Sequence, residues 1–332
     1  MADVRALPGI RYTAEKDIAA LVAPPYDVIS PEDQVRYYEQ HPENVIRLEL
    51  GREEPGDDQL DNRYTRAAET FAEWRLNGVL AQDAPSLYVY EQRFSANGAA
   101  YRRVGLLARV RLEPWESGVV LPHERTLAKP KDDRLRLTRA CAATLSPIRA
   151  LYDDPNGEIA AILAKIRKGK PRLAFTDERG EEHRLWLVQD EKLAATLAEL
   201  FAPRQLYIAD GHHRYETALV YRDEVREIRQ ELEPDDVVNF TLMGLTAVDD
   251  PGLLVLPTHR VVRGAEPERL NGMGERLAPY FTVDPLGAEP QEWLSALADH
   301  AGQDATAFVL VRPEGVALLR LKPEGRAAML GE

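Results

Sequence analysis

The segment that most strongly suggests chemistry is residues 206–218, which read LYIADGHHRYETA. A short apolar run leads into an Asp-Gly pair, and the residues that follow are typical of a helix. Glycine permits a sharp turn, and the first N–H groups of a helix are unpaired and carry partial positive charge. We therefore predict a site for an anion such as phosphate. Its residues are Asp210, Gly211, His212, His213 and Arg214.

The charges at this turn favour the same interpretation. Acidic residues are preferred at a helix start, whereas this helix begins with two histidines and Arg214, whose guanidinium can grip an anion. The simpler alternative is that Asp210 only caps the helix and the histidines are exposed. His212 and His213 are adjacent, so their side chains diverge by about 100° on a helix, which disfavours a shared zinc ion.

A second candidate is residues 121–126, which read LPHERT. His123 could act as a general base, and Glu124 could do the same or bind magnesium. The alternative is a polar surface loop that leads into a helix.

Two N-terminal segments supply further candidates. In residues 23–31, two prolines and the helix start at Ser30 are explained by geometry, which leaves Tyr26 and Asp27 as candidates for substrate contact. Residues 44–50 alternate like a half-buried strand. This strand would turn Asn44, and with it Arg47 and Glu49, towards a polar site, or would simply carry salt bridges.

Helical and strand patterns are mixed along the chain without regular alternation. This predicts an α+β class with mixed sheets and packed helices. We place a boundary near residue 150 and expect the two halves to pack together. The N-terminal half, 1–150, carries the Pro-Pro-Tyr-Asp and His-Glu-x-Thr motifs, and the C-terminal half, 151–332, carries the Asp-Gly-His-His-Arg turn.

Composition excludes several classes of protein. The 332 residues include 55 acidic and 42 basic side chains, a formal charge of −13, which makes nucleic-acid binding unfavourable. The single cysteine excludes an internal disulfide and a cysteine-cluster metal site. No apolar run is long enough to span a membrane and no secretory leader is recognisable, so we expect a cytoplasmic protein. The oligomeric state cannot be read from the sequence.

Five separated motifs together resemble the domain-of-unknown-function 1015 family over nearly the whole chain. The family name supplies no reaction. The motifs are Pro24-Pro25-Tyr26-Asp27-Val28-Ile29-Ser30, Asn44-Val45-Ile46-Arg47-Leu48, His123-Glu124-x-Thr126, Leu145-Ser146-Pro147-Ile148 and residues 208–218.

The short run from Asp210 to Arg214 also resembles the phosphate-binding motif of the ParB/sulfiredoxin-like fold. That superfamily includes CTP-binding partition proteins, sulfiredoxin and free-serine kinases. The resemblance implies a ParB/sulfiredoxin-like core with a nucleotide phosphate at this turn. Sulfiredoxin chemistry needs a cysteine where this chain has His212, so that chemistry is not expected.

Together these features and the resemblance predict a small-molecule kinase that transfers a phosphoryl group from ATP or ADP, with Mg²⁺, to a hydroxylated metabolite. The likeness to the free-serine kinases implies a serine-like acceptor. The expected catalytic residues are Asp27, His123, Glu124 and Glu216, and the expected substrate-binding residues are Tyr26, Asn44 and Arg47. Glu216 has an alternative role in completing the helix start. The rival interpretations are a nucleotide-gated regulatory protein that binds CTP or ATP and a metal-dependent hydrolase. The hydrolase would use His123, Glu124 and His212 or His213.

Overall fold

The computed structural model describes residues 1–14, 17–96, 98–124, 128–255, 259–300 and 306–330. They form two compact units, Met1–Val255 and Leu256–Glu332. The division therefore lies after Val255 and not near residue 150 as predicted. Strand β7 (Ile148–Tyr152) is hydrogen-bonded on both edges to strands from later in the chain, so residues on both sides of position 150 share one sheet.

A nine-stranded sheet organises the first unit, with the order β6-β10-β7-β11-β5-β4-β9-β8 and with β1 paired to β5. Strand β10 runs parallel to β6 and β11 parallel to β7, whereas the other described pairs are antiparallel. The α+β class with a mixed sheet is confirmed. Besides β7, the strands are β1 (Val4–Arg5), β4 (Leu87–Ala96), β5 (Ala99–Arg111), β6 (Val120–Leu121), β8 (Leu173–Thr176), β9 (Glu182–Val188), β10 (Leu206–Asp210) and β11 (Phe240–Ala247). Strands β2 (Ile10–Tyr12) and β3 (Leu80–Gln82) form a separate pair.

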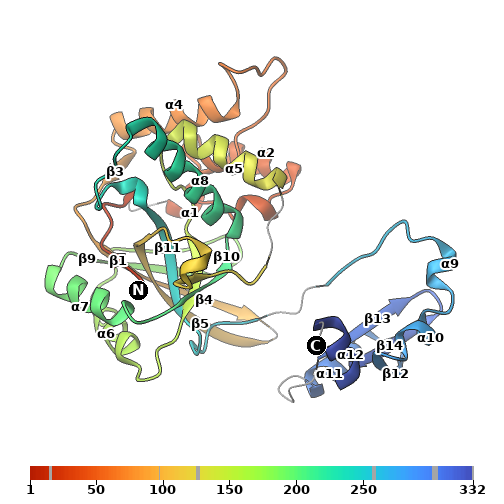
Figure 1. The fold of residues 1–332 in the computed structure, drawn as a ribbon. Helices are drawn as coiled ribbons and strands as arrows, with labels where there is room; N and C mark the ends of the chain where they lie inside the picture. The colour runs from red at the N-terminus through yellow and green to blue at the C-terminus, as the bar shows by residue number, and fades with distance from the viewer. Residues whose placement is uncertain (15–16, 97, 125–127, 256–258, 301–305, 331–332) are drawn as a thin grey trace. The chain divides into compact units, whose positions relative to one another are not determined.

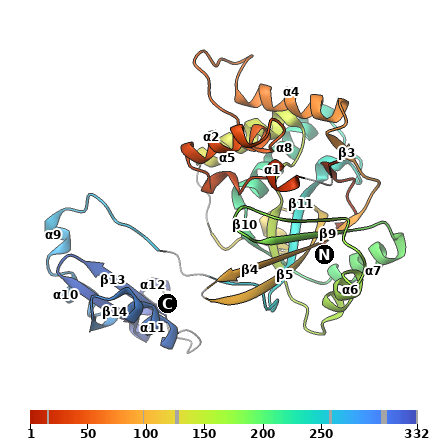
Figure 2. The ribbon, with the colours of Figure 1, turned by 180° about the vertical axis from the view of Figure 1, so that it is seen from behind.

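Helices lie on both sides of this sheet. In Figure 1 and Figure 2, α2, α4, α5 and α8 gather on one side, and α6 and α7 lie on the other. The predicted start of α2 is confirmed, because the Ser30 hydroxyl accepts a hydrogen bond from the Asp33 N–H at 3.1 Å. The helices are α1 (Ile18–Leu21), α2 (Pro31–Gln40), α3 (Ile46–Glu49), α4 (Arg63–Leu76), α5 (Ala128–Cys141), α6 (Glu158–Ile166), α7 (Glu191–Phe201) and α8 (His212–Arg229).

The main core lies against the sheet and includes the apolar faces of α6 and α7. Ile159 of α6 and Phe201 of α7 are fully buried with Tyr152 of β7 and Val89 of β4. Each such side chain contributes about 1.5–3 kcal/mol of hydrophobic stabilisation. This core fixes the strands, and the ends of the strands carry the candidate site.

The second unit is a small α+β layer. Its sheet has the order β12-β14-β13, in which β13 and β14 are antiparallel neighbours. The sequence-predicted site residues all lie in the first unit. The elements of the second unit are β12 (Phe281–Leu286), β13 (Ala307–Arg312), β14 (Gly315–Leu321), α9 (Pro267–Leu270), α10 (Met273–Leu277), α11 (Pro290–His300) and α12 (Pro323–Leu330).

One local prediction needs correction. Residues 44–50 do not form a strand, because the chain turns at Asn44 and forms the short helix α3. The predicted start of the later helix is confirmed, because α8 begins at His212 and both histidines and Arg214 belong to its first turn. Among the described residues, every helix is too short or too polar to cross a bilayer.

Candidate functional site

The sheet brings three motif-bearing segments to one edge. Strands β6 and β10 are parallel, with Val120 paired to Leu206. Parallel strands end at the same edge, so the loop with His123 and the start of α8 leave the sheet side by side. Strand β7 is antiparallel to β10 and therefore begins at this edge, directly after Pro147. Chain segments far apart in sequence thus meet at the start of α8.

Backbone geometry makes the start of α8 a possible anion site. Gly211 precedes the 18-residue helix with a φ of 96°, in the left-handed region that favours glycine. The backbone N–H groups of His212 and Arg214 donate to no described residue. His213 lies in the same turn and is half-buried. Unpaired N–H groups and the helix dipole both favour a bound anion at this position.

The Arg214 side chain folds back beneath the turn. Its Nη1 donates to the Pro147 carbonyl at 2.7 Å, and its Nη2 donates to the Asp210 carboxylate. A Cβ atom at Gly211 would lie 2.9 Å from Arg214 Nε, so the glycine also makes room for the guanidinium. We expected an uncompensated positive charge at this helix start. For Arg214 this expectation is wrong, because the Asp210 carboxylate already neutralises the guanidinium.

His212 joins the His123 loop to α8. The residue is only 2% exposed. Its Nε2 accepts the backbone N–H of His123 at 3.2 Å, and its Nδ1 lies 3.2 Å from a Glu124 oxygen. Burial and then the neighbouring His123 lower the pKa of His212, so the imidazole is neutral at pH 7. With both ring nitrogens engaged, His212 positions the loop and offers an incoming anion its backbone N–H.

His123 has the orientation of a general base. Its Nδ1 lies 2.6 Å from the Ile208 carbonyl oxygen, which can only accept, so Nδ1 carries the proton. The Nε2 atom then presents a lone pair, and the side chain is exposed. The His123 and His212 rings meet edge to face with centroids 4.5 Å apart. A histidine whose tautomer is fixed in this way can accept a substrate proton.

The N-terminal motif reaches the same region through Tyr26. The Arg134 guanidinium lies over the Tyr26 ring, with Cζ 3.9 Å from the centroid. Burial raises the pKa of Tyr26, while Arg134 and Arg214 act on it in the opposite direction, which places Tyr26 within electrostatic range of the α8 turn. Asp27 is exposed and makes no hydrogen bond or ion pair with the described residues.

Helix α5 supplies two cations to which the sequence analysis assigned no role. Arg134 is 6% exposed and donates to the Glu49 carboxylate at 3.2 Å and to the Glu49 carbonyl at 3.1 Å. Lys131 donates to Glu216 at 2.8 Å. The three-residue spacing of Lys131 and Arg134 puts them on one helix face. This spacing was the sequence signal from which the two residues could have been identified.

The substrate-binding roles predicted for Asn44 and Arg47 are not supported. Asn44 is fully buried; its Nδ2 donates to the carbonyls of Ala20 and Val22, and its Oδ1 accepts the Ile46 N–H. It therefore positions the segment before the Pro-Pro-Tyr-Asp motif and cannot contact a ligand. Arg47 donates to the Tyr38 carbonyl and stacks on the Tyr38 ring.

A metal site at the histidines has little support. His212 has no free nitrogen, which weakens a site built from His123, Glu124 and His212. In the described part of the chain, one group of three metal-ligating side chains comes together elsewhere, at Asp177, Glu181 and His183.

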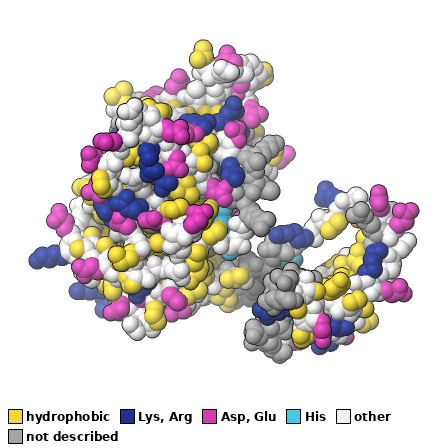
Figure 3. Space-filling view, viewed as in Figure 1, with side chains coloured by type: hydrophobic (Ala, Val, Ile, Leu, Met, Phe, Trp, Pro, Cys, Tyr) yellow, Lys and Arg dark blue, Asp and Glu magenta, His cyan; other side chains and the backbone are white. Residues whose placement is uncertain are grey.

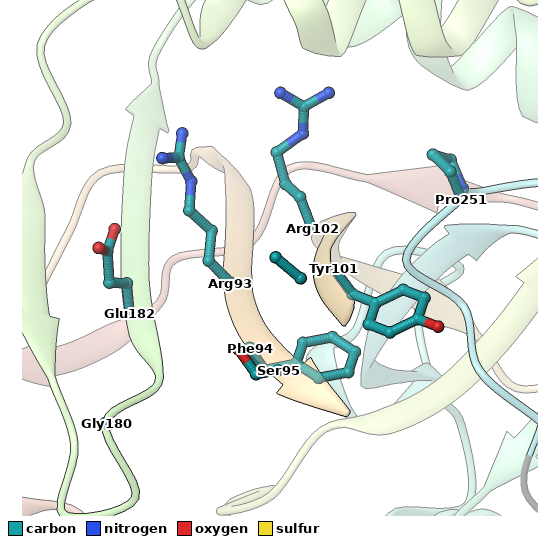
Figure 4. A pocket seen from close by; sticks show the side chains of 9 residues that line it. Arg93, Phe94, Ser95, Tyr101, Arg102, Gly180, Glu182 and Pro251 are labelled. Atoms are coloured by element: carbon teal, nitrogen blue, oxygen red, sulfur yellow. The ribbon is translucent and has the colours of Figure 1, made fainter. Parts of the chain in front are cut away.

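An open hollow of about 550 Å³ lies beside the β4–β5 hairpin. Figure 4 shows Arg93 and Arg102 side by side on its two strands, with Glu182 projecting from β9 nearby. None of the sequence-predicted site residues lines it. It therefore offers control positions away from the candidate site.

Comparison with known proteins identifies a family whose description assigns no activity. A family model described as "Protein of unknown function (DUF1015)" matches residues 4–330. No curated protein and no solved structure matches the chain.

Proposed function

The chain belongs to the DUF1015 family, whose description assigns no activity, and from the site itself we propose a nucleotide-dependent small-molecule phosphotransferase. The proposal includes a ParB/sulfiredoxin-like ancestry for the segment around the α8 turn. Its acceptor is a hydroxylated, serine-like metabolite. The observation that carries it is the meeting of His123 with the first turn of α8 through the buried His212.

The first turn of α8 is the proposed phosphate site. The backbone N–H groups of His212 and Arg214 face no described acceptor. The Arg214 guanidinium lies against Gly211 and is paired with Asp210, so it holds the turn that presents these N–H groups.

His123 is the proposed general base. Phosphoryl transfer needs little covalent chemistry from the protein beyond positioning, charge neutralisation and acceptance of the hydroxyl proton. The exposed Nε2 of His123 supplies the proton acceptor, and the Ile208 carbonyl keeps it in the correct tautomer. The Glu124 carboxylate lies 3.2 Å from His212 Nδ1 and is therefore held beside the proposed base.

A magnesium ion would be held mainly by the nucleotide phosphates, with few protein ligands. Asp27 fits this role, because its exposed carboxylate has no partner among the described residues. Glu216 is a weaker ligand candidate, since Lys131 already neutralises it. When bound, the ion would offset negative charge on the phosphates.

The rival interpretations have less support. The version of the hydrolase metal site that uses His212 is disfavoured, because both of its ring nitrogens are engaged. DNA binding would need a cationic surface, whereas acidic and basic side chains are interspersed on the face of the first unit seen in Figure 3. A nucleotide-gated regulator would use the same α8 turn without turnover, so activity measurements distinguish it.

Phosphorus NMR of the full chain with ATP, ADP or CTP, Mg²⁺ and a panel of hydroxylated acceptors tests the proposal. We expect a new phosphomonoester signal with a serine-like acceptor. His123→Gln should lower turnover by about 10²- to 10⁴-fold, as for loss of a general base, with unchanged nucleotide affinity. His41→Gln is the control, because His41 only accepts the Glu43 N–H.

If folded protein transfers no phosphoryl group from any of the nucleotides, the proposed enzymatic activity is refuted. Tight nucleotide binding under those conditions would assign the regulatory role. Equal turnover by His123→Gln and by the unaltered chain would show that His123 does not act as the general base.

A further inference from the structure

A cavity of about 270 Å³ lies beside the candidate site, between the Pro-Pro-Tyr-Asp segment and the β8–β9 hairpin. Its volume is slightly below the usual range for ligand pockets, so it suits a small metabolite and not a whole nucleotide. One wall is apolar and comes from Val22, Ala23, Pro24 and Pro25. The remaining walls come from strands of the sheet and are polar and aromatic.

Opposite charges line this cavity. The side chain of Arg149, in β7, makes no hydrogen bond or ion pair with the described residues, although acidic side chains line the same cavity. Glu181 of the hairpin accepts a hydrogen bond from Gln92 through Oε2, and Oε1 has no described partner. The cavity therefore presents an available cation and an available carboxylate oxygen.

Tyr90 lines the cavity together with these two charged residues. Burial raises the pKa of Tyr90, whereas Arg149 acts to lower it and Glu181 acts to raise it. Its oxygen lies 2.6 Å from His183 Nδ1, and the His183 ring stacks on Phe175 with centroids 4.7 Å apart. The polar groups of the cavity are therefore held in place.

The cavity adjoins the α8 turn. Arg149 is the register partner of Asp210 across an irregularity of the β7–β10 ladder between Ile208 and Asp210, and Asp210 bonds Arg214. Pro25, which lines the cavity, directly precedes Tyr26 of the candidate site. An occupant held by Arg149 is therefore a neighbour of the proposed phosphate site.

We infer that this cavity binds a small zwitterionic amino acid, with Arg149 anchoring the carboxylate and Glu181 the ammonium group. The assignment rests on the proposed phosphotransferase, for which the amino acid is the acceptor. A guanidinium forms two parallel hydrogen bonds with a carboxylate, and Arg149 is available for such a pair. A carboxylate oxygen at Glu181 complements an ammonium group.

Asp177 and His183 have supporting roles. Asp177 Oδ1 accepts the backbone N–H groups of Arg179 and Glu181, both at 2.9 Å, and Oδ2 lies 3.2 Å from His183 Nε2. These contacts shape the turn that presents Glu181. The same residues could instead gather around a divalent cation, which the experiment below distinguishes.

Calorimetry with L-serine, glycerate and ethanolamine, in the absence of nucleotide, tests the inference directly. The three probes share a hydroxymethyl group, but glycerate lacks the ammonium and ethanolamine lacks the carboxylate. Serine should bind about tenfold or more tighter than either, the equivalent of one charge-assisted contact. Arg149→Met should abolish the preference for serine over ethanolamine. Glu181→Gln should abolish the preference for serine over glycerate.

Matched substitutions of neighbouring residues serve as controls. Arg102→Met and Glu182→Gln, which line the separate hollow of Figure 4, should leave serine binding unchanged. Equal affinity for all three probes, or a loss of serine binding on addition of EDTA, would overturn the inference. Serine binding without phosphoryl transfer would support the cavity assignment and refute the proposed enzyme, so the two failures are distinguishable.

Discussion

The buried imidazole of His212 accepts a hydrogen bond from the backbone N–H of His123 at 3.2 Å, and this contact joins the loop after β6 to the first turn of α8. It requires a neutral imidazole, because a protonated ring has no acceptor nitrogen. The alignment of the proposed general base with the proposed phosphate site therefore depends on the protonation state of His212.

Acidification should destabilise the protein through His212. Its pKa in the folded chain lies below 6.5, mainly because of burial. As the pH falls through 6.5 towards the folded pKa, the unfolded chain gains a proton that the folded chain does not, so the free energy of unfolding decreases. Urea unfolding between pH 5 and 8 measures this decrease. His212→Gln, whose amide oxygen can still accept the His123 N–H, should show a flatter profile, and an identical profile would contradict the assignment.

Arg214→Ala should weaken nucleotide binding by about tenfold or more without unfolding the protein. The variant removes a guanidinium under the proposed phosphate site and two hydrogen bonds, to Pro147 and Asp210. The stability cost should be about 1–3 kcal/mol. Calorimetry with ATP and urea unfolding measure the two effects. Arg226→Ala, on an exposed turn of the same helix, is the control. Unchanged ATP affinity in Arg214→Ala would show that the first turn of α8 does not bind the nucleotide.

Gly211→Ala should cost more stability than Gly157→Ala. Both glycines precede a helix in the left-handed region, with φ of 96° and 66°, so both variants incur about 1–2 kcal/mol of backbone strain. Only Gly211 has a neighbour that a Cβ would meet, Arg214 Nε at 2.9 Å; Gly157 has open space. The excess cost should shrink in the Gly211→Ala, Arg214→Ala double variant. Equal costs for the two single variants would show that the guanidinium moves aside freely.

Asn44→Ala should destabilise the protein by about 1–3 kcal/mol and leave ligand affinities of the folded chain unchanged. The variant leaves the carbonyls of Ala20 and Val22 and the Ile46 N–H without their partner. Thermal unfolding and calorimetry separate the two effects. A selective loss of serine affinity without loss of stability would restore the substrate-contact role. Asn77→Ala, on an exposed helix end, is the control.

Arg134→Met should be more costly, at about 3–5 kcal/mol, because it leaves the buried Glu49 carboxylate without its cation. Adding Glu49→Gln should recover part of the loss, since the unpaired charge is then absent. Chemical unfolding of both variants measures this recovery. If the double variant is no more stable than the single one, the pair acts mainly through packing.

Local sequence signals predicted the parts of the site that depend on backbone geometry. Gly211 after an apolar strand predicted the turn that opens α8, and Ser30 with Pro31 predicted the start of α2. The strand predicted over residues 44–50 was wrong, because the apolar residues Ile46 and Leu48 of the alternating pattern are buried from the short helix α3. A short segment of this kind carries too few residues for its periodicity to separate a helix from a strand.

The sequence by itself determined the α+β class, the acidic charge and the glycine turn before a helix, since these depend on composition and near neighbours along the chain. Only the tertiary structure decided which motifs meet. The parallel pairing of β6 with β10 brought His123 to α8, and the pairing of β7 with β10 placed Arg149 beside Asp210. Strand order depends on the packing of segments more than fifty residues apart, and no local pattern encodes it.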